Sequence, residues 1–231
     1  MRFGRIKRIK LRLLPCGLML LAITQIAQSA DFVAEIVDKA GKPVPDAVIL
    51  VQTNEQSVAP NNNGVPENSI VDQKDKSFVP HVSVISPRTL VSFPNSDDTR
   101  HHVYSFSDAK TFELKLYRAN DAPPVEFPKT GIVTLGCNIH DNMKAYLYVT
   151  DNPFHGVSDS SGMARVPYAD SSLPLSLIVW HPQLEAALEL TNQAPDSAGH
   201  IARITLPIDW QTPQQGKDAH ELESLLKRFK R

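Results

Sequence analysis

The eight residues 136–143 contain three side chains that bind soft or borderline metal ions. They are the thiol of Cys137, the imidazole of His140 and the thioether of Met143. One cysteine and two histidines with a weak axial methionine form the donor set of a type 1 (blue) copper electron-transfer site. The octet therefore lacks one histidine. The upstream candidates for it are His101 and His102.

Other interpretations of these side chains remain open. A free cysteine is often a small buried apolar residue, and Met143 taken alone fits core packing as well as axial ligation. Cysteine with two histidines could hold zinc, although structural zinc sites usually have more thiolates. A Cys–His nucleophile pair needs a third, orienting group, and no local protease signature surrounds Cys137. The spacing of the three donors favours a metal site.

The other histidines are expected to be solvated or hydrogen-bonded. They are His81, His155, His181, His200 and His220. Since His155 follows the octet most closely, its distance from the site is the one to check.

The first thirty residues have the layout of a secretory signal peptide. Six basic residues and no acidic one come first, an apolar run from Leu13 to about Ile23 follows, and the sequence Ala27-Gln28-Ser29-Ala30 comes last. The apolar run is too short for an ordinary membrane span. We expect cleavage after Ser29 or Ala30, with an uncleaved anchor as the alternative, and hence a periplasmic protein.

Removal of this segment changes the charge and the cysteine count. The chain has 24 basic and 25 acidic residues, so loss of six basic residues brings the net charge from −1 to near −7. An acidic surface argues against a nucleic-acid partner. Cys16 is lost as well, which leaves Cys137 without a disulfide partner. A lone cysteine in an exported chain is a reactive thiol or is occupied, and a metal would occupy it.

The remaining chain has the pattern of an all-β protein. Short segments of alternating hydrophobicity are separated by Pro, Asp, Asn and Ser, which is typical of antiparallel sandwiches and barrels. Within the block 69–149 the predicted strands are 70–71, 78–85, 89–93, 103–106, 111–116, 131–135 and 145–149. Outside it, strands are expected at 32–38, 46–51, 175–180 and 201–208, a hairpin at 157–166, a strand or short helix at 185–190, and a polar loop at 53–68.

The block 69–149 resembles a cupredoxin of the plastocyanin and amicyanin kind. The matching features are Phe78-x-Pro80, the run Leu90–Asp97, His101-x-Val103, and Gly131 six residues before Cys137-x-x-His140-x-x-Met143. The two-residue gaps on either side of His140 match the short ligand loop of amicyanin. The family binds one copper ion between loops at one end of an eight-stranded Greek-key sandwich.

This resemblance implies one type 1 copper site. The implied ligands are His101, Cys137, His140 and Met143. His101 follows Phe93 by eight residues and Asn95 by six, as the histidine ligand does in the family. His102 stays the alternative, because only one of two adjacent strand residues should face the metal.

The resemblance further implies an electron carrier and not an enzyme. Backbone amides near Asn138, and the side chain of Asn95 or Asn138, would bond to the ligands. His140 would be the electron port, within a small apolar patch that includes Ile139. The expected partner is a c-type cytochrome or a periplasmic dehydrogenase. The alternative is a non-redox module for copper binding and delivery, or for binding in the cell envelope.

The segments around the cupredoxin-like block resemble a second, transthyretin-like sandwich of the carboxypeptidase-regulatory type. The features are Gly41–Ala47, Asp159-x-x-Gly162 and Ile178–Pro182, in the order of that module. We therefore expect residues 31–52 and 150–210 to form one sandwich into which the cupredoxin, residues 69–149, is inserted. The combination resembles periplasmic proteins labelled as methylamine-utilisation proteins.

The tail, residues 211–231, is expected to contain a short helix from Asp218. Asp218 and Glu221 form a capping box, and apolar residues follow at helical spacing. The helix would lie on the second sandwich, or alternatively contact a membrane surface or a partner.

Overall fold

The structure is a computed structural model of the chain, and it describes residues 31–52, 68–167, 175–193 and 201–211. Every regular element in these ranges is a β-strand, which confirms the all-β prediction for them. The expected signal peptide and the expected helix from Asp218 lie outside the described residues. Within the described ranges no helix is long and apolar enough to cross a membrane.

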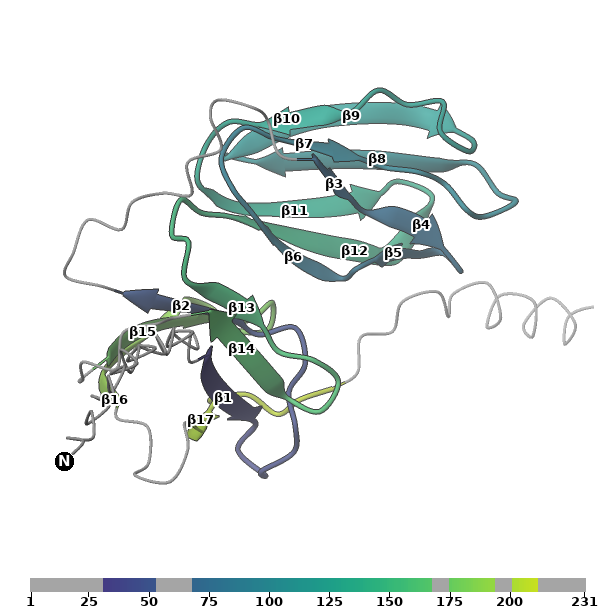
Figure 1. Cartoon of the computed structure of the whole chain (residues 1–231). Helices are drawn as coiled ribbons and strands as arrows, with labels where there is room; N and C mark the ends of the chain where they lie inside the picture. Colours follow the sequence, from purple (N-terminus) through teal and green to yellow (C-terminus); the bar gives the residue numbers. More distant parts are fainter. Residues whose placement is uncertain (1–30, 53–67, 168–174, 194–200, 212–231) are drawn as a thin grey trace, which may run out of the picture.

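Strands β3 to β12 form a central sandwich of residues 68–149, the upper part of Figure 1. Its larger sheet has the order β6-β12-β11-β8-β9. The strands of this sheet are β6 (Val82–Ile85), β8 (His101–Ser107), β9 (Lys110–Tyr117), β11 (Gly131–Cys137) and β12 (His140–Val149). The smaller sheet consists of β10 (Val125–Phe127), β7 (Thr89–Ser92) and β3 (Asn68–Ile70). A hairpin of β4 (Asp72–Lys74) and β5 (Ser77–Val79) completes the sandwich.

Strict alternation of side chains gives this sandwich its core. In β11, Val133, Leu135 and Cys137 are buried, and in β12 every second residue from Met143 to Val149 is buried. These side chains pack with Phe78, Phe93 and Phe127 from the opposite side in one apolar cluster. Cys137 and Met143 therefore belong to the inner face of the sheet. The sequence does not predict β10, since three residues are too few to show an alternation.

Strands β1, β2 and β13 to β17 form a terminal sandwich, the lower part of Figure 1. One sheet contains β14 (Met163–Pro167), β1 (Asp31–Val37) and β17 (Ile201–Thr205), in that order. The other contains β13 (His155–Val157), β2 (Val48–Gln52), β15 (Leu175–Trp180) and β16 (Leu188–Gln193). A second apolar cluster, which includes Ile36, Ile49 and Leu177, fills the space between these two sheets.

The predicted hairpin at 157–166 is wrong. Its two halves are β13 and β14, which belong to different sheets, because β13 pairs with β2 and β14 pairs with β1. The buried hydroxyl of Ser158 donates to the Val44 carbonyl and accepts from the Ala47 N–H. These bonds attach the chain to the segment before β2, so it crosses from one sheet to the other.

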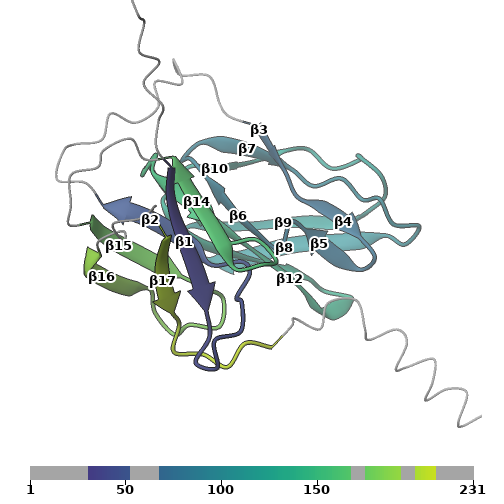
Figure 2. The same cartoon turned by 60° about the horizontal axis from the view of Figure 1, so that its bottom comes forward.

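The two sandwiches contact each other through the outer face of β6 and β12. Tyr146 and Tyr148 of β12 place their rings 5.6 and 5.7 Å from the ring of Trp180 in β15, both in edge-on geometry. A hydrogen bond accompanies this contact, with His81 Nδ1 2.8 Å from Asp46 Oδ2. Figure 2 shows the same arrangement from a second direction, with β6 and β12 next to the terminal sandwich. The inner face of β12 thus bears Met143, and its outer face forms the joint.

Candidate metal centre

Three of the four predicted ligands meet at one end of the large central sheet. His101 begins β8, Cys137 ends β11 and His140 begins β12, and these strands are neighbours in the sheet. The donor atoms of the three side chains all lie within 4.8 Å of one another. His101 and Cys137 are buried and His140 is half-buried. Among the described residues, this is the one group of three such side chains close enough to hold a metal.

The distances within the group fit ligands of a shared ion. Cys137 Sγ lies 3.8 Å from Nδ1 of His101 and 3.8 Å from Nδ1 of His140. A metal–sulfur bond of about 2.3 Å and a metal–nitrogen bond of about 2.0–2.1 Å place the two donors about 3.5–3.8 Å apart for tetrahedral to trigonal angles. Both imidazoles therefore present the same nitrogen to the sulfur at a spacing that one first-row metal ion would bridge.

His102 lies outside this group. The alternation of β8 buries His101 and turns His102 to the other face of the sheet, where its ring lies 5.6 Å from that of Tyr104. His102 Nε2 is 3.0 Å from Glu113 Oε1, without the alignment of a hydrogen bond. The structure thus brings His101, and not His102, together with Cys137.

Met143 lies in the same buried cluster as Cys137 and is 1% exposed. The register of β11 and β12 changes at this point, since Gly136 pairs with Lys144 but Cys137 pairs with His140. The three residues between His140 and Lys144 in β12 therefore have no pairing partners in β11. This irregularity lets one strand contribute His140 at the rim and Met143 from the core side.

The surroundings of Cys137 favour its thiolate. Burial raises the pKa of the Cys137 thiol, but hydrogen bonds with His101 and from the backbone N–H groups of His102 and Ile139 lower it further than burial raises it. The resulting pKa is below the ordinary value for cysteine. The thiolate is the form of cysteine that binds metals. The Ile139 amide fulfils the expectation of a backbone donor near Asn138.

Asp97 is a residue of this site that the sequence reasoning missed. Its Oδ2 lies 2.7 Å from His101 Nε2, the ring nitrogen on the far side from Cys137. Burial lowers the pKa of His101, but Cys137 and Asp97 raise it more, so that it exceeds the ordinary value. The available signal was an aspartate four residues before the predicted histidine ligand. A carboxylate on the outer nitrogen of a ligand histidine is a common arrangement in metal sites.

Asn95 has a different role from the one predicted. Its side chain donates to the backbone carbonyls of Thr99 and Tyr117 and accepts from the N–H of Asp97. These bonds shape the loop that presents Asp97. Asn138, the other candidate for a ligand bond, has an exposed side chain.

The remaining described histidines have structural contacts elsewhere. His155, in β13 of the terminal sandwich, has Nδ1 2.8 Å from the backbone carbonyl of Asn152. His81 pairs with Asp46, and His181 Nδ1 accepts from the N–H of Gln183. His200 and His220 lie outside the described residues.

The solved structures similar to this chain include copper proteins, all at low similarity. No protein-family model and no curated protein sequence matches the chain. A purple cupredoxin from Nitrosopumilus maritimus is 18% identical and matches 36% of this chain and 100% of its own, with a TM-score of 0.32. A reduced Cu(I) form of an amicyanin mutant is 14% identical over 44% of this chain and 98% of its own, with a TM-score of 0.34.

A third similar structure is a copper-containing nitrite reductase from Thermus scotoductus. It is 23% identical over 51% of this chain but only 28% of its own, with a TM-score of 0.34. This chain therefore matches a small part of that enzyme.

Proposed function

We propose that this protein binds one copper ion in a type 1 site and carries single electrons between redox partners. The proposed ligands are His101, Cys137, His140 and Met143. The observation that supports this most strongly is the pair of 3.8 Å separations from Cys137 Sγ to the two Nδ1 atoms. Bound copper would supply one-electron chemistry, by alternating between its cuprous and cupric states.

The donor set favours copper over zinc. The group contains a single thiolate, whereas structural zinc sites usually contain several. A buried thioether, which is a soft ligand, suits cuprous copper. His101 and Cys137 exclude solvent because they are at most 3% exposed. A buried site held by three adjacent strands suits electron transfer, since its side chains need not move between oxidation states.

The rim of the site supports a role for His140 as the electron port. His140 is half-buried, and the neighbouring Ile139 is 45% exposed. A small, partly apolar contact around these two residues fits the brief encounters of redox proteins, which have small interfaces. The proposed partner is a c-type cytochrome or a periplasmic dehydrogenase, and export through the N-terminal segment is part of the same proposal.

The proposed domain division assigns electron transfer to residues 69–149. Residues 31–52 and 150–210 would form a transthyretin-like sandwich with a supporting or partner-binding role, as in periplasmic proteins of the methylamine-utilisation type. The pairing of β1 with β14 and of β2 with β13 supports this division, because it joins strands from both sides of the central block.

A visible absorption spectrum of the copper-loaded protein tests the proposed function. We expect an intense sulfur-to-copper charge-transfer band, which Cys137→Ala abolishes. A colourless protein with one copper per chain would overturn the type 1 assignment. A reversible voltammetric wave would support electron transfer. Rapid loss of copper to a chelator in both oxidation states would instead support copper delivery.

A further inference from the structure

Asp97 and His101 form a hydrogen-bonded pair on the side of the site away from Cys137. The 2.7 Å separation between Asp97 Oδ2 and His101 Nε2 is that of a strong, charge-assisted hydrogen bond. The His101 side chain is 0% exposed and the Asp97 side chain 15% exposed. With Nε2 donating its hydrogen to Asp97, the lone pair of a neutral His101 ring is on Nδ1, the atom that faces Cys137 Sγ.

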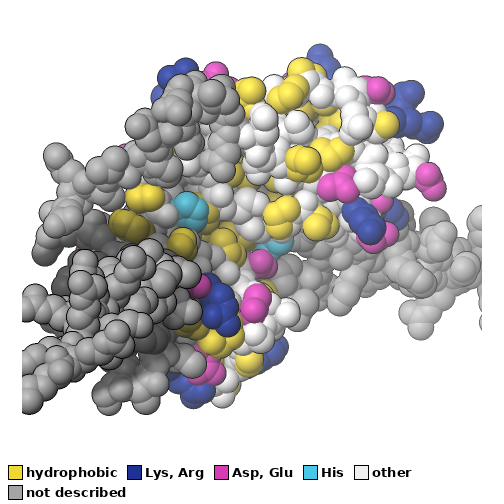
Figure 3. Space-filling view, viewed as in Figure 1, with side chains coloured by type: hydrophobic (Ala, Val, Ile, Leu, Met, Phe, Trp, Pro, Cys, Tyr) yellow, Lys and Arg dark blue, Asp and Glu magenta, His cyan; other side chains and the backbone are white. Residues whose placement is uncertain are grey.

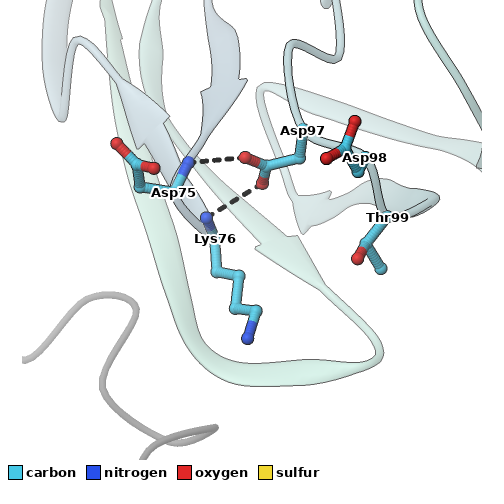
Figure 4. A pocket seen from close by; sticks show the side chains of 5 residues that line it. All are labelled: Asp75, Lys76, Asp97, Asp98 and Thr99. Atoms are coloured by element: carbon cyan, nitrogen blue, oxygen red, sulfur yellow. Dashed lines mark hydrogen bonds between the residues drawn. The ribbon is translucent and has the colours of Figure 1, made fainter.

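The turn between β4 and β5 holds Asp97 in place. The backbone N–H groups of Asp75 and Lys76 donate to the two oxygens of the Asp97 carboxylate, at 2.6 and 2.9 Å. Figure 4 shows both bonds, with Asp97 pointing toward the backbone of the turn. Asp75 and Lys76 have φ angles of 54° and 57°, and this left-handed turn directs two successive amides at one carboxylate.

A second set of bonds ties the Asp97 loop to the same hairpin. The Ser96 hydroxyl donates to Asp72 Oδ2 at 2.8 Å, and the Ser96 N–H donates to the carbonyl of Gln73. Together with the two amides of the turn, these bonds make Asp97 a fixed group and not a mobile surface side chain.

We propose that Asp97, anchored by the β4–β5 turn, is the positioning residue of this centre. It fixes the orientation and the protonated nitrogen of His101, and through the ring it favours cupric over cuprous copper. This inference rests on the proposed function. The physical reason is that a carboxylate bonded to the outer nitrogen makes an imidazole a stronger electron donor, and a stronger donor stabilises the more highly charged ion.

Asp98 provides a matched control. It follows Asp97 directly, lines the same hollow in Figure 4 and is exposed. Figure 3 shows acidic and basic side chains side by side where β4 and β5 lie. Loss of one exposed charge there therefore changes a surface that already carries charges of both signs. Asp98→Asn removes the same charge as Asp97→Asn but leaves the bond to His101 intact.

The first test uses the copper-free protein. Proton–nitrogen NMR of the wild type should show a slowly exchanging ring hydrogen on His101 Nε2. Asp97→Ala should lose this resonance, and Asp97→Asn and Asp98→Asn should keep it, because an asparagine oxygen still accepts the bond. Circular dichroism verifies that the variants are folded. An unchanged Nε2 resonance in Asp97→Ala would overturn the positioning role, whether or not the protein binds copper.

The second test measures copper binding and the reduction potential of the full chain. Asp97→Ala should weaken cupric binding about 10–100-fold in competition with a chelator, the usual effect of losing such a partner. Asp97→Asn should raise the potential, by about 59 mV for each tenfold loss of cupric relative to cuprous affinity. Asp98→Asn should leave both quantities near the wild-type values.

The outcomes separate the two hypotheses. If the wild type has no charge-transfer band, the proposed function fails, and the NMR test still decides whether Asp97 positions His101. If the wild type has the band but both Asp97 variants match Asp98→Asn in affinity and potential, the inference about Asp97 fails.

Discussion

His101 uses both of its ring nitrogens, and this determines what it can do. Nδ1 faces Cys137 Sγ at 3.8 Å, and Nε2 bonds to Asp97 at 2.7 Å. His102 follows directly in the chain but lies on the other face of β8, beside Glu113. Adjacent residues of a strand face opposite sides, so two neighbouring histidines have separate environments.

The first prediction compares these two histidines. His101→Ala should abolish the charge-transfer band of the copper-loaded protein, because it removes a donor from the buried group. His102→Ala should keep the band, because it removes only a ring on the outer face of the sheet. The backbone N–H of His102, which bonds to Cys137, is retained in this variant. Visible spectra at equal copper content measure both variants. Loss of colour in His102→Ala alone would contradict the assignment of His101.

At the level of the elements, three neighbouring strands explain how distant residues meet. His101 and Cys137 are 36 positions apart in the chain, but β8 and β11 pair directly and antiparallel. The start of one strand and the end of its antiparallel neighbour lie at the same edge of the sheet. The turn from β11 into β12 then returns His140 to this edge.

Gly136 has a packing role next to the site. It pairs with Tyr104, and a Cβ atom at Gly136 would lie 2.9 Å from Cζ of the Tyr104 ring. The rings of His102 and Phe106 flank Tyr104, with centroid distances of 5.6 and 5.1 Å. A larger residue before Cys137 would therefore require the Tyr104 ring to move.

The second prediction concerns Gly136→Ala. The added methyl group should destabilise the protein by about 1–3 kcal/mol, as overpacking usually does. It should also shift the charge-transfer band, because Cys137 is the next residue. Denaturant unfolding and visible spectra measure the two effects. In a protein that already carries Tyr104→Ala, adding Gly136→Ala should hardly change the free energy of unfolding. The same loss of stability with Tyr104 and with alanine at position 104 would refute the clash.

For the whole molecule, β12 is the element that contributes both to the proposed metal site and to the contact between the two sandwiches. His140 and Met143 at its start belong to the site, and Tyr146 and Tyr148 near its end pack against Trp180 of the terminal sandwich. In the pairing with β11, His140 lies opposite Cys137 and Tyr146 lies opposite Thr134, so the two are three strand positions apart, about 10 Å. The joint is separated from the metal site mainly because it lies on the outer face of β12, whereas Met143 lies on the inner face.

The third prediction concerns Trp180→Ala. Removal of this buried ring should cost about 3–5 kcal/mol of stability. The charge-transfer band and the reduction potential should stay at their wild-type values, because Trp180 packs on the outer face of β12 and the buried ligands lie on the inner face. Thermal unfolding and voltammetry measure these effects, with Trp210→Ala as a control away from the two tyrosines. A changed potential in Trp180→Ala alone would show that the joint and the site are coupled.

The fourth prediction concerns stability at acidic pH. Burial lowers the pKa of His181 from 6.5 to about 4. As the pH falls from 6.5 toward 4, the unfolded chain binds a proton that the folded protein does not bind. The stability contribution that is present above pH 6.5 is therefore lost across this range, by about 3 kcal/mol.

Urea unfolding at several pH values between 7 and 4 measures this loss. His181→Phe, which keeps a ring beside Trp210, should flatten the pH dependence. His155→Phe, in the same sandwich but only half-buried, should keep the dependence of the wild type. The same slope in all three proteins would show that His181 is not its source.

The sequence alone indicated the all-β class and the donor octet, because both depend on local patterns. Alternation reveals strands, and Cys137, His140 and Met143 are close enough in the chain to be recognised by spacing. The alternation of β8 also implied that only one of the adjacent histidines faces inward, and the family spacing selected His101.

Only the tertiary structure decided which distant groups meet. The amides that hold Asp97 against His101 come from a turn more than twenty residues earlier. No periodicity encodes such contacts. The hairpin predicted at 157–166 failed for the same reason, because strand partners are chosen by burial across the whole molecule. Local pattern determines what an element is, whereas packing determines what it touches.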